Sequence, residues 1–454
     1  MAFESIDPAT GESFYHQEPW GEAERETALA AVAAATPGWA ATPVAERAEA
    51  VRAIAGELRR RADELATLIT REVGKLHREA RGEIEKCAWV CEYYADHGPG
   101  FLADEPIETD AGKSLVAYQP LGTVLAVMPW NFPFWQVFRF AAPALVAGNT
   151  GVLKHASNVP QSALAIEEVI RDAGLPADIF RTLMIRAADV DAVIDDPRIA
   201  AVTLTGSEPA GRAVASRAAA NIKKAVLELG GSDPFIVLDD ADVEQAVEAA
   251  ATSRFLNNGQ SCIAAKRFIL TPGIADDFVE RFRQRVEAMT VGDPAAETTQ
   301  LGPMARTDLR DELHTQVADS VRAGAEVVTG CTLPDGPGAF YPPSILDHVA
   351  EGQRAFEEEL FGPVAIVLRA DDAEHAVSLA NGSRFGLGGA VWTADSQRGE
   401  AIARRLECGA AFVNGIVKSD PRLPFGGVKA SGFGRELSRH GIHEFVNAKT
   451  VWVK

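Results

Sequence analysis

Short apolar runs alternate with amphipathic stretches from about residue 114 to residue 392, and this alternation constrains the fold more than any other feature. The apolar runs have the length of strands, and the stretches between them repeat apolar residues at helical spacing. The expected strands of a first series are 114–118, 122–128, 150–154, 199–204 and 225–229, with helices at 160–174 and 208–221. Such alternation predicts parallel βαβ units and a doubly wound α/β sheet.

A second α/β series follows Gly230 and Gly231. Its expected strands are 235–238, 266–270 and 388–392, and its expected helices are 242–255, 274–289, 306–323 and 372–380. The first hundred residues read as helical instead, with one helix over 43–74 and another over 78–97. The segment 330–343, rich in Gly and Pro, is expected to be a surface loop.

Length and charge bound the possible functions. A chain of 454 residues fits two or three domains. The 64 acidic and 44 basic residues give a net charge of -20, which argues against nucleic acid or an anionic membrane as the main partner. Five cysteines without framework spacing indicate a reducing, cytoplasmic setting. We see no signal peptide, and no apolar run approaches the roughly 20 residues needed to span a bilayer.

Cys262 lies in "NNGQSC", where a helix is expected to end. A cysteine among small and amide side chains is placed where a substrate can reach it, and an accessible thiolate is a nucleophile. Inert packing is the competing interpretation, because free cysteine usually behaves as a small buried hydrophobe.

Two further residues have chemistry that would suit a reactive thiol. Glu228 is a lone acid at the end of an apolar strand, and partial burial there would raise its pKa toward the range of a general base. The alternative is a structural carboxylate that caps backbone N–H groups. Asn131, in "PWNFP", could donate its amide to an oxyanion, or it could simply form a local turn.

Two strand ends in the first series could receive a phosphate or a ribose. Gly206 and Gly211 frame a turn between a strand and a helix, where backbone N–H groups and the helix dipole favour an anion. This is not the G-x-G-x-x-G fingerprint, and a glycine at such a turn is often purely steric. Lys154 ends another strand, a position that suits a ribose or phosphate, although a solvated lysine is the usual outcome.

The order and combination of these motifs resemble the aldehyde dehydrogenase superfamily from about residue 6 to the C-terminus. The matching motifs are "PWNFP" (129–133), "LTGSEPAG" (204–211), "LELGG" (227–231), "NNGQSC" (257–262), "EELFGPV" (358–364) and "PFGGVKASGFGRE" (424–436). The resemblance implies an α/β fold with a modified Rossmann cofactor domain, a related α/β catalytic domain and a small β oligomerisation element. The implied boundaries are 1–104 and 121–229 for the cofactor domain, 230–418 for the catalytic domain, and 105–120 and 437–454 for the oligomerisation element, with 419–436 as a bridging segment.

The resemblance also implies the chemistry. Cys262 matches the nucleophile that forms a thiohemiacetal and then a thioester, and Asn131 with the backbone N–H of Cys262 matches the oxyanion hole. Glu228 matches the base that activates the hydrolytic water, which argues against a branch that transfers the acyl group to a thiol. The implied cofactor-binding residues are Trp130, Lys154, Ser157, Gly206, Ser207, Gly211, Leu229, Glu359 and Phe361.

Cofactor preference follows from Ser157. Family members that prefer NAD often carry an acid near the adenine ribose, where it binds the 2′-hydroxyl and would repel a 2′-phosphate. At the matching position this chain has Ser157, three residues after Lys154. We therefore expect NADP to be preferred, with NAD possible.

Substrate preference follows from Arg139 and Ser419. Succinate-semialdehyde dehydrogenases carry an arginine eight residues beyond the oxyanion asparagine, and Arg139 has that spacing. A guanidinium suits a carboxylate through paired hydrogen bonds. Ser419 matches a further carboxylate contact, but Leu256 stands where members of that group often have a second arginine. The resemblance implies oxidation of succinate semialdehyde to succinate by a homodimer or homotetramer without a metal.

Three alternatives remain at this point. Leu256 and the aromatic pair Phe134 and Trp135 would suit an aldehyde dehydrogenase for other aliphatic or aromatic aldehydes. A non-catalytic binding protein on the same fold is the alternative of another class. A thioesterase or esterase that uses Cys262 without a cofactor is the third.

Overall fold

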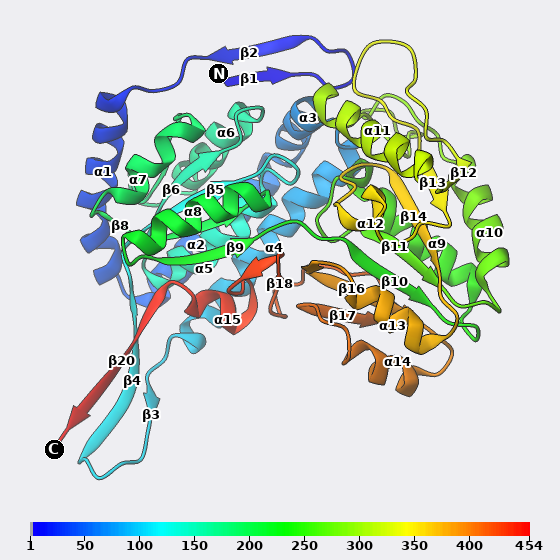
Figure 1. The fold of residues 1–454 in the computed structure, drawn as a ribbon. Helices are drawn as coiled ribbons and strands as arrows, with labels where there is room; N and C mark the ends of the chain where they lie inside the picture. The colour runs from blue at the N-terminus through cyan, green and yellow to red at the C-terminus, as the bar shows by residue number, and fades with distance from the viewer. Residues whose placement is uncertain (1–2) are drawn as a thin grey trace.

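The computed structural model describes residues 3–454, which form two α/β halves and a projecting β arm (Figure 1). The first half contains a six-stranded sheet and the second a seven-stranded sheet. This architecture confirms the α/β fold class expected from the alternating pattern. Within the described part of the chain, no helix is long and apolar enough to cross a bilayer.

The six-stranded sheet has the order β19-β9-β8-β5-β6-β7. Its parallel strands are β5 (Thr123–Met128), β6 (Thr150–His155), β7 (Phe180–Thr182), β8 (Ile199–Thr205) and β9 (Lys224–Glu228). The helices of this half are α5 (Trp135–Ala147), α6 (Pro160–Asp172), α7 (Val190–Asp195) and α8 (Glu208–Ala220), with a short helix η1 (Ala187–Asp189). The expected series is therefore confirmed from residue 122 onward, but the strand expected at 114–118 lies outside this sheet, because it pairs antiparallel with the C-terminal strand.

The seven-stranded sheet has the order β12-β13-β14-β11-β10-β16-β17, and only β12 is antiparallel. Its strands are β10 (Asp233–Val237), β11 (Ala265–Leu270), β12 (Glu326–Thr329), β13 (Ser344–Asp347), β14 (Val364–Arg369), β16 (Gly388–Trp392) and β17 (Ala410–Val413). Its helices are α9 (Val243–Phe255), α10 (Ala275–Glu287), α11 (Thr307–Arg322), α12 (Arg354–Glu357), α13 (Ala373–Asn381) and α14 (Ser396–Ala403). The second series is confirmed, and 330–343 contains no helix or strand.

The N-terminal region corrects two expectations. It begins with an antiparallel hairpin of β1 (Phe3–Ile6) and β2 (Ser13–Gln17), because Phe3 and Ser5 alternate inward with exposed neighbours. After α1 (Glu22–Ala41), the helix expected over 43–74 is two helices, α2 (Val44–Arg60) and α3 (Ala62–Val73). The break is at Arg61, whose φ of -99° and ψ of 9° leave the helical region. The expected helix over 78–97 lies within α4 (His77–Phe101).

The arm consists of β3 (Glu105–Pro106), β4 (Lys113–Pro120) and the C-terminal strand β20 (Val446–Val453), which follows the short helix α15 (Ser438–His443). β20 pairs with β4 along its whole length, from Val446 opposite Pro120 to Val453 opposite Lys113. The arm thus joins two segments that are far apart in the sequence (Figure 1). Trp452 and Val453 at its end are half exposed.

The chain passes directly from one half to the other between β9 and β10 (Figure 1). Glu228 is the last residue of β9, and Asp233 is the first of β10. The short strand β19 (Gly432–Phe433) returns from the second half and pairs with β9 at Glu228 and Leu227. A second small pairing joins β15 (Phe385–Gly386) to β18 (Val428–Lys429). The carboxyl end of β9 therefore lies where the two halves meet, a position where α/β sheets commonly bind ligands.

Candidate active site

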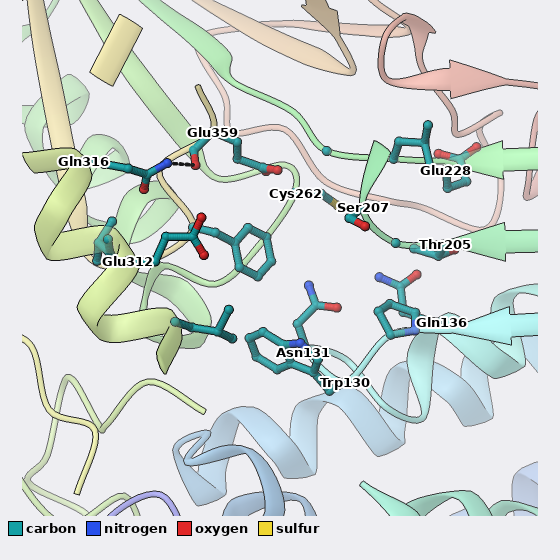
Figure 2. A pocket seen from close by; sticks show the side chains of 17 residues that line it. Trp130, Asn131, Gln136, Thr205, Ser207, Glu228, Cys262, Glu312, Gln316 and Glu359 are labelled. Atoms are coloured by element: carbon teal, nitrogen blue, oxygen red, sulfur yellow. Dashed lines mark hydrogen bonds between the residues drawn. The ribbon is translucent and has the colours of Figure 1, made fainter. Parts of the chain in front are cut away.

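Two cavities, each of about 300 Å³, meet at Cys262. The strand-end cavity lies beside the carboxyl ends of β8 and β9; it is lined by Trp130, Asn131, Thr205, Gly206, Glu228, Glu359 and Phe361, among others (Figure 2). The helix-side cavity lies between α4, α5 and two loops; it is lined by Lys86, Phe132, Trp135, Arg139, Leu256, Ile263, Val417 and Ser419, among others. Cys262 and Gln136 line both cavities. A group on the Cys262 sulfur can therefore be approached from two directions.

The loop before Cys262 is held by its own amide side chains. It follows α9 through the short helix η2 (Leu256–Gly259), in which Asn257 and Asn258 have φ values of 53° and 55°. Asparagine tolerates this left-handed region better than most residues. Asn258 donates to the carbonyl oxygens of Gly74 and Pro303 at 2.8 and 2.9 Å, and its own oxygen accepts from the Gly302 N–H at 2.7 Å. The asparagines thus build a rigid support rather than contact a substrate.

Arg254 ties this loop to the segment that carries Glu359 and Phe361. Its guanidinium is fully buried and donates to the carbonyl oxygens of Val364, Leu360 and Gly362. It also reaches the carbonyl of Gly259 at 3.4 Å. Burial lowers the pKa of Arg254 to about 9, and the carbonyl contacts replace the water that it has lost. The loop of the cysteine and the "EELFGPV" segment are therefore fastened to each other.

Cys262 itself is partly exposed, and its thiol is uncharged at neutral pH. Burial of the sulfur raises the pKa of Cys262 to about 12, although Arg139 and Lys266 act in the opposite direction. Lys266 lies beneath the loop: it donates to the carbonyl oxygens of Ser261 and Cys262 at 2.8 and 2.9 Å and pairs with Glu359 at 3.1 Å. A thiol in this environment needs a base to become a nucleophile.

Glu228 is buried in the strand-end cavity without a partner. Within residues 3–454 neither oxygen of its carboxyl group accepts a hydrogen bond, which excludes the alternative in which it caps backbone N–H groups. Burial raises the pKa of Glu228 well above its usual value, the nearby Glu436 raises it further, and Arg139 lowers it. A carboxyl group with a raised pKa and no structural bond has the properties of a general acid or base.

Asn131 lies beside the loop of Cys262 (Figure 2). Its side-chain N–H donates to the carbonyl of Gln260 at 3.1 Å, and its backbone carbonyl accepts from the side chain of Asn257 at 2.8 Å. These bonds cross between segments that are 126 and more residues apart, so Asn131 is not merely the polar residue of a local turn. The amide has a second N–H for which the described residues provide no acceptor.

Gly206 and Gly211, which frame the turn after β8, have different structural roles. A Cβ at Gly211 would lie 2.6 Å from Leu229, so this glycine lets α8 pack closely on β9. A Cβ at Gly206 would meet nothing nearer than Leu204 at 3.7 Å, and Gly206 lines the cavity. The steric interpretation thus accounts for Gly211, whereas the space beside Gly206 is left for a ligand.

The remaining expected cofactor residues fall into two groups. Trp130, Ser207, Leu229, Glu359 and Phe361 line the strand-end cavity, and the rings of Trp130 and Phe361 meet edge to face at 5.8 Å. Lys154 and Ser157 lie outside this lining, at and just beyond the end of β6. Lys154 is half-buried, which lowers its pKa, and Ser157 is exposed. Lys154 and Ser157 therefore lie at the same edge of the sheet as the strand-end cavity, but not in its wall.

Several residues of the strand-end cavity were not anticipated, and three of them are polar side chains on helices. Gln136 is on α5, and Glu312 and Gln316 are on α11. Gln316 donates to the backbone carbonyl of Glu359 at 3.4 Å (Figure 2) and to the carboxylate of Glu358 at 2.8 Å. Glu312 and Gln316 are one helical turn apart, as on any solvated helix face, so the sequence contains no signal that α11 closes a cavity.

The two expected substrate residues have different surroundings. Arg139 is buried in an ion pair with Glu436 and lies 4.6 Å from the ring centre of Phe425. Ser419 accepts a hydrogen bond at 2.7 Å from Lys86, which sequence reasoning did not single out. Both expected residues line the helix-side cavity, but the cation next to Ser419 is Lys86.

The comparisons with known proteins agree with this geometry. The model of the aldehyde dehydrogenase family matches residues 1–451. The chain is 51% identical over 453 residues to a probable succinate-semialdehyde dehydrogenase [NADP(+)] of Synechocystis sp., with 100% of both chains covered. It is 51% identical over 449 residues to the succinate semialdehyde dehydrogenase [NAD(P)+] Sad of Escherichia coli, covering 99% of this chain and 97% of that one.

Among solved structures, succinic semialdehyde dehydrogenase from Streptococcus pyogenes in complex with NADP+ superimposes with a TM-score of 0.98 at 37% identity, and all of both chains is covered. Sequence and fold thus agree over the full length of the chain. The chain belongs to the aldehyde dehydrogenase family.

Proposed function

We propose that this protein oxidises succinate semialdehyde to succinate, with NADP+ as the preferred cofactor and NAD+ as a possible one. The observation that carries the proposal is the position of Cys262 at the junction of two cavities. One cavity can hold a cofactor and the other an aldehyde, with the thiol between them. The names of the relatives described above support the choice of aldehyde and cofactor.

The chemistry is assigned to three side chains. Cys262, once deprotonated, attacks the aldehyde carbon, and the carbonyl oxygen becomes an oxyanion. The free N–H of Asn131 and the backbone N–H of Cys262 stabilise that charge. Loss of hydride from the same carbon leaves a thioester on Cys262. Glu228 then removes a proton from a water molecule, which attacks the thioester and releases the acid and the thiolate.

The residues present fit a dinucleotide. Gly206 leaves space for a ligand, Glu359 offers carboxylate oxygens to a ribose, and Trp130 and Phe361 offer apolar faces. Lys154 pairs with no carboxylate in residues 3–454, and burial alone shifts its pKa, so its ammonium group is available for a phosphate or ribose. The neutral Ser157 does not repel a 2′-phosphate. When bound, NADP+ supplies the hydride acceptor.

We extend the proposal to the parts of the molecule. Residues 1–104 and 121–229 form the cofactor domain, 230–418 the catalytic domain, and 419–436 bridge them. The arm of 105–120 with 437–454 is assigned to assembly as a homodimer or homotetramer, and its half-exposed Trp452 and Val453 support that role. We place the enzyme in the cytoplasm, because all five cysteines are free thiols.

The test measures reduction of NADP+ and NAD+ with succinate semialdehyde, hexanal and benzaldehyde. We expect the highest kcat/KM for succinate semialdehyde with NADP+. A higher value for hexanal or benzaldehyde would move the assignment to another aldehyde dehydrogenase. Trp135 and Phe132 in the helix-side cavity would suit it, whereas Phe134, expected to act with Trp135, is buried outside the cavity lining. Absence of reduction with every pair would leave a binding protein.

A further inference from the structure

We propose that Lys86, together with Ser419, binds the carboxylate of the aldehyde substrate in the helix-side cavity. This inference rests on the proposed function and makes it specific. It assigns substrate selection to Lys86 on α4, and not to the expected Arg139 alone. Both Lys86 and Ser419 line the cavity that also contains Cys262.

Lys86 is already positioned for such a ligand. Its ammonium group donates to the Ser419 hydroxyl at 2.7 Å and lies 4.2 Å from the ring centre of Trp135. An ammonium carries three N–H donors, and a hydroxyl that accepts from it can still donate its own hydrogen. The pair therefore presents a positive charge and several donors on one wall of the cavity.

No carboxylate of residues 3–454 forms an ion pair with Lys86, because the nearby acids have other partners. Glu83 pairs with the buried Lys75 and accepts the backbone N–H groups of Phe134 and Trp135 at 2.9 and 3.0 Å. Asp420 pairs with Arg422 at 2.7 Å. Lys86 is thus a half-buried cation without a counter-ion among the described residues.

The other charged groups of the cavity do not take its place. Arg139 is already neutralised by Glu436. Glu79 accepts the N–H of Asn257 at 3.0 Å, and burial raises its pKa. Lys418 is exposed at the mouth of the cavity. Leu256 contributes only an apolar side chain.

The energetics favour an anionic ligand. The pKa of Lys86 is lowered to about 8, mainly by burial and also by Arg139 on α5, while Glu83 and Cys87 on α4 and Asp420 on the adjoining loop act in the opposite direction. An unpaired ammonium away from water is unfavourable, and a bound carboxylate would offset that cost. A neutral aldehyde would leave it unpaired.

The experiment compares succinate semialdehyde with butanal, which has the same number of carbon atoms and no charge. The readout is the ratio of their kcat/KM values with NADP+, in the full-length enzyme and in three variants. Lys86→Met should lower the ratio by roughly 10- to 100-fold, through a higher KM for succinate semialdehyde. Lys86→Arg keeps the cation and should retain most of the ratio. Lys418→Met removes the same charge from the exposed mouth and should change it less than about threefold.

The outcomes separate this inference from the proposed function. A wild-type preference for succinate semialdehyde that survives in Lys86→Met, or that is lost in Lys418→Met instead, would overturn the role of Lys86 and leave the reaction intact. A wild type that prefers butanal would overturn the proposed substrate as well. If Lys86→Met does not fold, the pH dependence of the wild type decides the question. The ratio should fall as pH rises through about 8, where Lys86 loses its charge, and a flat ratio would reject the proposal.

Discussion

The two cavities that meet at Cys262 have the same volume, about 300 Å³, but they are built differently. The strand-end cavity is lined by Glu228 at the end of β9 and by Gly206 in the turn after β8. It is also lined by Glu359, whose segment Arg254 holds to the cysteine loop. The helix-side cavity takes Lys86 from α4 and Trp135 from α5, and the rest of its wall is mainly apolar.

This difference separates two tasks. Groups at strand ends have positions fixed by the backbone of a sheet, which suits the chemistry that every substrate shares. Side chains on helices can be exchanged without moving a strand, so the helix-side cavity can acquire a new preference while the chemistry is retained. The predictions below test whether the two sides are as independent as this comparison implies.

The largest effect should come from the residue that both cavities share. Cys262→Ala removes the nucleophile, so we expect kcat to fall about 1,000-fold or more for every aldehyde tested. Binding of NADP+, followed by quenching of tryptophan fluorescence, should stay within a few-fold of the wild type. Residual activity above a few per cent with any aldehyde would mean that another group carries the acyl intermediate.

Glu228→Gln should impair only the chemistry performed in the strand-end cavity. We expect steady-state kcat to fall roughly 100- to 1,000-fold, because the thioester loses its base, while rapid mixing still shows a burst of reduced cofactor. In the wild type the base must be ionised, and the pKa of Glu228 is raised by burial. The hydrolytic rate should therefore rise with pH through that raised pKa and be lost below it. A variant without a burst would place Glu228 in the first half of the reaction.

Ser157→Glu tests whether the sheet edge at Ser157, outside the strand-end cavity, belongs to the cofactor site. An acid there would repel a 2′-phosphate and bind a 2′-hydroxyl, so the preference for NADP+ over NAD+ should fall by about 100-fold. The measurement is kcat/KM for each cofactor with succinate semialdehyde saturating. Ser157→Ala serves as the control that changes size without adding charge. An unchanged preference in the glutamate variant would remove Ser157 from the cofactor site.

The smallest effect concerns the support behind Cys262. Asn258→Ala leaves the carbonyls of Gly74 and Pro303 and the N–H of Gly302 without partners, which should lower the free energy of unfolding by about 2 kcal/mol. Thermal melting should show the loss as a lower Tm. The exposed Gln397→Ala on α14 is the control and should melt with the wild type. Equal melting of both variants would show that the asparagine is not structural.

The two sides also differ in how well the sequence predicts them. The alternation of strands and helices predicts both sheets, and Cys262, Glu228 and Asn131 lie in short motifs at strand or helix ends. Lys86 has no such signal: it lies on a helix beside Cys87, and its partner Ser419 is reached only through the tertiary fold. The β1 hairpin was missed because strands of four and five residues carry too short a pattern to outweigh the helices that follow.

Arg139 illustrates a further limit. Its spacing from Asn131 places it correctly on the wall of the helix-side cavity, yet its charge is balanced by Glu436, which follows nearly three hundred residues later. A pattern of residue types can predict where a cation lies, but it does not show which acid pairs with it. Only the fold distinguishes the paired Arg139 from the unpaired Lys86.

The pairing of β19 with β9 has a consequence for the order in which the enzyme is built. Glu228 is synthesised in the middle of the chain, but Gly432, its partner across the sheet edge, and Glu436 beside its carboxyl group come near the end. Contacts between such distant segments form late, because a long loop must first be closed. A nascent chain can therefore complete most of its cofactor sheet while the surroundings of its catalytic carboxyl group are still unformed. Glu228 therefore acquires its catalytic surroundings only when the end of the chain has returned to the sheet.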